Sequence, residues 1–207
     1  MSEPKQTVYV VDDDASHLSS MGRLLRAAGY TVACFSSATE FLAKLSSPAA
    51  GCVITDLRMP GMDGAALQRE LVRFEISLPI VFLTGHGDIP TTVEAMRLGA
   101  EDFLVKTAPA GVLLAAVERA LARDAKERVE QAERRELVST FDRLTPRERE
   151  VLGQVLRGRR NKQIAHDLGI AERSVKRHRT NLMRKLEVDS VAELALLAAE
   201  AGLQVDR

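Results

Sequence analysis

The chain has 207 residues, of which 45% are hydrophobic and 28% charged, and its formal net charge is zero. This composition is typical of a folded globular protein and excludes a wholly disordered chain. The longest apolar runs span six residues. A membrane helix needs about 20, so we expect no membrane partner. The polar N-terminus does not read as a signal peptide, so we expect a cytoplasmic protein.

The charges are distributed unevenly along the chain. Residues 1–121 carry 10 basic and 14 acidic residues, residues 122–143 carry 6 of each, and residues 144–207 carry 13 basic and 9 acidic residues. Between residues 157 and 185 there are ten basic residues and only two acidic ones. We therefore expect two domains, 1–121 and 144–207, joined by a helical linker over 122–143 and bound to different partners.

Five short apolar segments alternate with helix-like stretches in the first domain. The segments are Val8–Val11, Thr31–Phe35, Cys52–Thr55, Ile80–Leu83 and Phe103–Val105. Repeated strand–helix alternation predicts an α/β fold with a doubly wound, five-stranded parallel sheet and helices on both faces. One of these helices is expected to begin at Asp88, with Pro90 in its first turn.

The segment from Pro109 to Phe141 has no glycine after Gly111 and predicts a long helix. Its apolar positions form a narrow stripe of Leu121, Ala125, Val129 and Ala132. Arg128 and Glu136 interrupt this stripe, so a dimeric coiled coil and a plain solvated linker are both open.

Capping signals divide residues 144–207 into four short helices. Thr145, Pro146 and Glu148 form a capping-box signature, and Gly158 ends the first helix. The other helices are expected from a cap at Asn161 to Gly169, over Glu172–Leu186 and over Ser190–Ala201. This pattern predicts a small all-α tetrahelical domain that contains a helix-turn-helix.

Polar side chains follow four of the expected strands. Asp12 and Asp13 follow the first, Asp56 the third, Thr84 the fourth and Lys106 the fifth. Because the carboxyl ends of parallel strands share one edge, these groups should converge there. Crowded carboxylates favour a divalent cation, and an all-oxygen ligand set suits Mg²⁺. One carboxylate can then attack a phosphoryl group, with Lys106 and Thr84 stabilising the transferred oxygens.

Residues 7–121 resemble a response-regulator receiver domain. The motifs are Val-Asp-Asp-Asp at 11–14, Ile-Thr-Asp-Leu-Arg-Met-Pro-Gly-Met-Asp-Gly at 54–64, Leu-Thr-Gly-His-Gly-Asp at 83–88 and Asp-Phe-Leu-Val-Lys at 102–106. The resemblance implies that Asp56 accepts phosphate from a sensor histidine kinase. It also implies that Asp12, Asp13 and Asp56 hold Mg²⁺ together with the backbone carbonyl of Arg58. Thr84 and Phe103 would form a switch pair.

The chain departs from the family pattern directly after Lys106. The family usually has a proline there, joined through a cis bond, whereas this chain has Thr107. A cis bond before threonine costs about 2.5–4 kcal/mol, so either the loop is trans and reshaped or strain is stored beside the site. We expect metal binding and phosphoryl transfer to be retained. The departure puts in doubt how phosphorylation is coupled to a change of the domain surface.

The helix expected over Glu172–Leu186 has one apolar and one basic side. Val175, Leu182 and Leu186 share a sector, and arginines occupy the opposite one. Such a helix can pack with one side and enter the major groove of double-stranded DNA with the other. A solvated charged face is the alternative, and the near absence of acids disfavours it. The expected DNA-contacting residues are Asn161, Lys162, Arg173, Lys176, Arg177, Thr180 and Arg184.

Residues 144–202 also resemble a LuxR-type DNA-binding domain. The matching motifs are Leu-Thr-Pro-Arg-Glu-Arg-Glu-Val-Leu at 144–152, Asn-Lys-Gln-Ile-Ala at 161–165 and Ser-Val-Lys-Arg-His-Arg at 174–179. Together, the two resemblances follow the order of NarL/FixJ-type regulators. They imply a transcription factor that is controlled by phosphorylation, forms a homodimer when phosphorylated and has RNA polymerase as a further partner.

Two other functions fit parts of the sequence. A phosphatase that forms an aspartyl-phosphate typically needs a second acid two residues after the nucleophile, and Arg58 stands there, so we expect no enzyme. A phosphate-sensing adaptor without DNA output would not need the basic segment 157–185.

Overall fold

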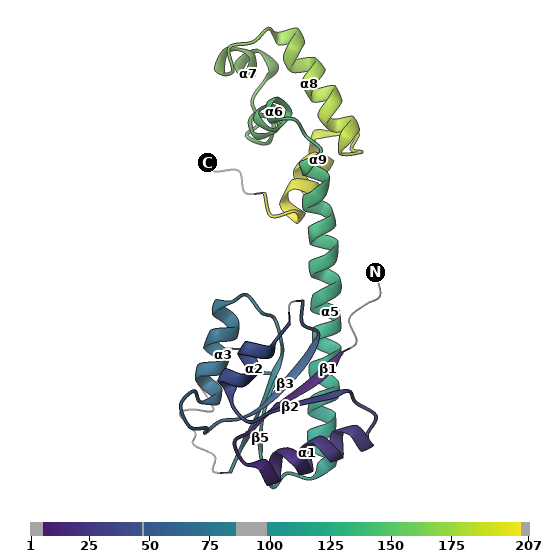
Figure 1. The fold of residues 1–207 in the computed structure, drawn as a ribbon. Coiled ribbons are helices and arrows are strands. Elements are labelled where there is room, and N and C mark those ends of the chain that lie inside the picture. The colour runs from purple at the N-terminus through teal and green to yellow at the C-terminus, as the bar shows by residue number, and fades with distance from the viewer. Residues whose placement is uncertain (1–5, 47, 86–98, 204–207) are drawn as a thin grey trace. The chain divides into compact units, whose positions relative to one another are not determined.

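The first part of the chain folds around a five-stranded parallel sheet (Figure 1). The computed structural model describes residues 6–46, 48–85 and 99–203. The strands are β1 (Thr7–Val11), β2 (Val32–Phe35), β3 (Gly51–Asp56), β4 (Ile80–Thr84) and β5 (Asp102–Val105), in the spatial order β2-β1-β3-β4-β5. This order and the parallel pairing confirm the predicted α/β fold.

Helices cover both faces of the sheet, as expected of a doubly wound fold (Figure 1). The helices α2 (Ala38–Lys44) and α3 (Gly64–Arg73) pack on one face. The other face is covered by α1 (Ala15–Ala27) and the beginning of α5 (Ala110–Asp142). Every residue of β3 is buried because successive side chains point into these two cores. The helix predicted from Asp88 lies outside the described residues.

The start of β3 requires a glycine. Gly51 has a φ of 133°, and a Cβ atom built on it would lie 1.8 Å from the carbonyl oxygen of Thr7. The backbones of β1 and β3 therefore approach closely at this end, in a conformation that L-residues rarely adopt. This pairing aligns the two strands, whose other ends carry the acidic residues.

Helix α5 is 33 residues long and continues from one compact unit into the next. The chain divides into Met1–Arg128 and Val129–Arg207. Of the apolar stripe, Leu121 packs against the core of the first unit, whereas Val129 is 54% exposed. The coiled-coil pairing and the domain boundaries at 121 and 144 stay predictions.

The second unit contains four short helices around one apolar core, as predicted. They are α6 (Pro146–Leu156), α7 (Asn161–Asp167), α8 (Glu172–Lys185) and α9 (Val191–Glu200). The capping box of Thr145 and Glu148 is present at the start of α6. The expected cap at Asn161 is wrong by one residue, because Arg160 has the extended backbone of an N-cap and Asn161 is already helical. Among the described residues, no helix is both long and apolar enough to cross a membrane.

Candidate functional site

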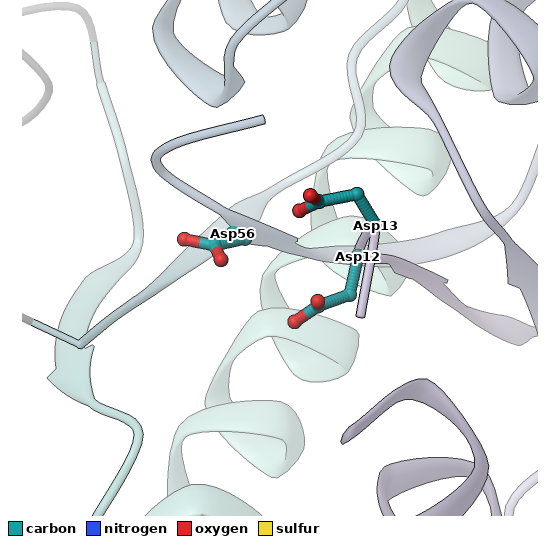
Figure 2. A group of neighbouring side chains, drawn as sticks. All are labelled: Asp12, Asp13 and Asp56. Carbon is teal, nitrogen blue, oxygen red and sulfur yellow. The ribbon is translucent and has the colours of Figure 1, made fainter. Parts of the chain in front are cut away.

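Three carboxylates gather at the carboxyl ends of β1 and β3. Val11 pairs with Thr55 in the parallel register, so the residues that follow, Asp12 and Asp56, lie at the same edge of the sheet. One side-chain oxygen from each of Asp12, Asp13 and Asp56 lies within 4.8 Å of the others (Figure 2). Asp12 and Asp56 are buried, at 2% and 9% exposure, whereas Asp13 is exposed.

Lys106 reaches this edge from the end of β5. Its Nζ lies 2.8 Å from Asp12 Oδ2 and 2.6 Å from Asp56 Oδ2. Its backbone N–H donates to the Thr84 carbonyl at 2.8 Å, which fixes the chain at this point. Partial burial alone would lower the pKa of the ammonium, but the hydrogen bonds to the two carboxylates outweigh it and raise the pKa. Thr107 in place of the family's proline therefore does not prevent Lys106 from reaching both acids.

The donor set at this edge fits a hard divalent cation. All three clustered side chains offer carboxylate oxygens, and the exposed Asp13 leaves the cluster accessible from water. Mg²⁺ prefers one or two carboxylates and keeps several water ligands. The Arg58 backbone N–H donates to Asp56 Oδ1 at 3.0 Å, which orients the carboxylate. The role of the Arg58 carbonyl as a metal ligand stays a prediction.

Thr84 and Phe103 lie on the neighbouring strands β4 and β5. Thr84 is the last residue of β4 and is 1% exposed. Phe103 is half-buried, and its ring centroid lies 6.1 Å from that of its cross-strand neighbour Phe82. Phe103 therefore packs against the sheet core as an aromatic side chain commonly does. A switch between Thr84 and Phe103 stays a prediction.

His17 was missed by the sequence analysis. It lies in the first turn of α1, and its Nδ1 is 2.6 Å from Asp12 Oδ2. Asp14, the N-cap of α1, accepts hydrogen bonds from the backbone N–H groups of Ser16 and His17, which places this turn beside the acidic edge. The available signal was the position of a histidine three residues after a cap that directly follows the acids.

The basic side of α8 is exposed in the second unit. Val175 and Leu182 are completely buried, so the opposite side faces solvent. The exposed members of the predicted DNA-contacting set are Lys162, Arg173, Lys176, Arg177, Thr180 and Arg184. Asn161 is half-buried instead, and its Oδ1 accepts a hydrogen bond from Arg179 Nη1 at 2.7 Å. Arg179, which sequence reasoning did not single out, thereby links α8 to the start of α7.

A partly buried ion pair joins the end of α8 to the start of α6. Lys185 Nζ lies 2.6 Å from Glu148 Oε2 and donates to the Arg143 carbonyl at 3.1 Å. Glu148 is 3% exposed, and the same oxygen accepts from the Thr145 backbone N–H at 2.9 Å. Burial would raise the pKa of Glu148, but the bonds from Lys185 and Thr145 lower it overall. Helix α8 is therefore tied to α7 near its middle, by Arg179, and to the start of α6 at its last residue, by Lys185.

The two units match two known protein families. Residues 8–118 match the response regulator receiver domain, and residues 142–198 match the bacterial regulatory proteins of the luxR family. The response regulator protein TodT of Pseudomonas putida F1 is 42% identical over 194 residues, which cover 94% of this chain and 86% of TodT. The transcriptional regulatory protein FixJ of Bradyrhizobium diazoefficiens is 39% identical, and the match covers 98% of each chain.

Solved structures give the same result. The response regulator StyR is 46% identical, with a TM-score of 0.77 over 95% of this chain and all of that one. Full-length FixJ from B. japonicum is 38% identical, with a TM-score of 0.58 over 97% of this chain and 98% of that one. The chain belongs to the NarL/FixJ type of response regulators, the two-component transcriptional regulators that join a receiver to a luxR-type DNA-binding domain.

Proposed function

We propose that Asp56 is the phosphoacceptor and that its phosphorylation by a sensor histidine kinase controls DNA binding by the second domain. The contact of Lys106 with both Asp56 and Asp12 carries this proposal. An ammonium placed between two buried carboxylates offsets their repulsion before the reaction and stabilises the phosphoryl oxygens afterwards. The functional division is a receiver over 1–121, a linker over 122–143 and a DNA-binding domain over 144–207.

The transfer needs one bond to form and one to break. A carboxylate oxygen of Asp56 attacks the phosphorus of the kinase phosphohistidine, and the P–N bond electrons return to the imidazole nitrogen. Asp12, Asp13, Asp56 and the Arg58 carbonyl would hold Mg²⁺, which, when bound, neutralises charge on the transferred oxygens. Thr84 would donate its hydroxyl hydrogen to one of those oxygens, and Phe103 would report the change as the switch aromatic.

The phosphoryl group is a signal rather than an intermediate of turnover. Arg58 stands two residues after Asp56, where a phosphatase of this chemistry carries an acid, so we propose that the chain is not an enzyme. We propose that the protein acts in the cytoplasm, where it can bind both DNA and RNA polymerase. We also propose a homodimer in the phosphorylated state, since paired helix-turn-helix domains read half-sites about one helical turn apart.

Labelling with a small phosphodonor in Mg²⁺ tests the acceptor. The parent protein should gain one phosphoryl group, and Asp56→Asn should gain none while keeping its far-UV circular dichroism. Asp13→Ala should label weakly, with partial recovery in excess Mg²⁺. Full labelling of Asp56→Asn would show that the acceptor is another residue.

Binding to DNA tests the control by phosphate. Phosphorylated and unphosphorylated protein should differ in affinity for DNA fragments selected from total genomic DNA, and sedimentation should show more dimer in the phosphorylated state. Equal association and equal DNA binding in both states would mean that the phosphate does not control the output. An absence of DNA binding in either state would favour the phosphate-sensing adaptor.

A further inference from the structure

His17 lies against one carboxylate of the acidic edge, that of Asp12. Its Nδ1 is 2.6 Å from Asp12 Oδ2, and its side chain is 21% exposed. Lys106 Nζ lies 2.8 Å from the same oxygen, and the Asp14 backbone N–H donates to Asp12 Oδ1 at 2.9 Å. Since an ionised carboxylate only accepts hydrogen bonds, the imidazole donates through Nδ1–H.

The hydrogen bonds leave Asp12 with one direction in which to bind a cation. A carboxylate offers about four lone-pair sites. His17 and Lys106 occupy the two on Oδ2, and the Asp14 N–H occupies one on Oδ1. The site that remains is on Oδ1. Because rotation about the Cβ–Cγ bond of an aspartate is only weakly restricted, the donors decide where that site points.

We infer that His17 is a positioning residue for Mg²⁺, which acts by holding the Asp12 carboxylate in the orientation that presents Oδ1. The inference rests on the proposed metal site of Asp12, Asp13 and Asp56. Hydrogen-bond partners of metal-ligating groups orient their ligands, and their loss typically weakens metal binding by about 10–100-fold. Without the imidazole, Lys106 alone restrains Oδ2, and binding must order the carboxylate first.

Mg²⁺ titration by calorimetry on the full, unphosphorylated chain tests this inference without any phosphodonor. His17→Ala should weaken Mg²⁺ binding by about tenfold or more. It leaves the cap of α1 in place, because the bond to Asp14 comes from the backbone N–H of residue 17. His17→Asn should restore most of the affinity, because the amide nitrogen of asparagine stands where Nδ1 stands, one bond beyond Cγ. His17→Gln places its amide one bond further and should bind as weakly as His17→Ala.

Four outcomes would overturn the inference. If His17→Ala binds Mg²⁺ with the affinity of the parent, His17 does not orient Asp12 for the metal. If His17→Ala binds Mg²⁺ more tightly, His17 competes with the metal. His17→Asn that is as weak as His17→Ala would leave only a packing role. Asp13→Ala separates this inference from the proposed function: if that variant also binds Mg²⁺ normally, the metal site itself is wrong, and the inference falls with it.

Discussion

Substituting Lys185 by methionine should show how much the stability of the DNA-binding domain depends on one partly buried ion pair. The ammonium lies 2.6 Å from Glu148 Oε2, and the Glu148 side chain is only 4% exposed. Methionine keeps most of the aliphatic stem but removes the charge. The Glu148 carboxylate would then keep the hydrogen bond from the Thr145 N–H but lose the ammonium of Lys185.

The expected loss follows from the burial of the two partners. Removing one partner of a fully buried pair costs about 3–5 kcal/mol. The Lys185 side chain is 29% exposed, so water screens part of the interaction. We therefore expect a loss of about 2–3 kcal/mol, which for a domain of this size lowers the Tm by roughly 10–20 °C. The double variant Glu148→Gln with Lys185→Met removes both charges and should recover more than half of this loss.

Scanning calorimetry of the full chain measures the effect. The transition that specific DNA raises identifies the DNA-binding domain. Arg184→Met is the matched control, because Arg184 is the exposed neighbour on the same helix, and it should cost less than about 0.5 kcal/mol. The ion-pair reasoning is refuted if Lys185→Met and Arg184→Met have the same Tm. It is also refuted if the double variant is less stable than Lys185→Met.

The same pair gives a pH dependence with a definite sign. The pKa of Glu148 is lowered below its ordinary value of 4.5 in the folded chain. Its contribution to the free energy of unfolding is therefore complete above pH 4.5 and is lost as the pH falls through the folded pKa. In Lys185→Met, the hydrogen bond from Lys185 no longer lowers the pKa of Glu148, so burial raises this pKa and favours the neutral acid. The difference in Tm between this variant and the parent should therefore shrink on acidification.

Other substitutions test the strand start, the helix cap and the DNA interface. Gly51→Ala should cost about 3 kcal/mol or more in a thermal melt, because its Cβ would meet backbone, whereas Gly153→Ala meets nothing within 4 Å and should cost nothing. Thr145→Ala should cost about 1 kcal/mol in urea unfolding by losing the capping box. Arg177→Ala should lose about 1–3 kcal/mol on specific DNA and relax base preference, whereas Lys162→Ala should weaken binding to all DNA and reduce the salt slope by about one. The opposite pattern in these two variants would reverse the assignment of base and phosphate contacts, and no effect of either would mean that the basic side of α8 is only solvated.

Much of the acidic edge was predictable because its parts are local in sequence. Asp12 and Lys106 each follow a short apolar strand and Asp56 ends one, and parallel strands in one sheet end at the same edge. In the structure, Lys106 comes within hydrogen-bonding distance of both acids at this edge. The same holds for the basic side of α8, which helical periodicity places opposite the buried Val175 and Leu182.

Contacts between elements were not predictable in the same way. Polar residues are common at the helix positions of His17, Arg179 and Lys185. Their spacing in the sequence does not predict which residue each one binds. Arg179 nevertheless binds Asn161, whose side chain is therefore already engaged by α8.

The amino-acid sequence by itself determined the order of strands and helices along the chain. It also determined which acids and which lysine lie at the acidic edge, and which side of α8 is basic. These depend on periodicity and on residues at element ends, which are properties of short segments. Only the tertiary structure decided that His17 donates to Asp12 and that Lys185 locks α8 to α6. Such pairings depend on how one element is placed against another, because a hydrogen bond forms only within about 3 Å and a shift of one helix position removes it.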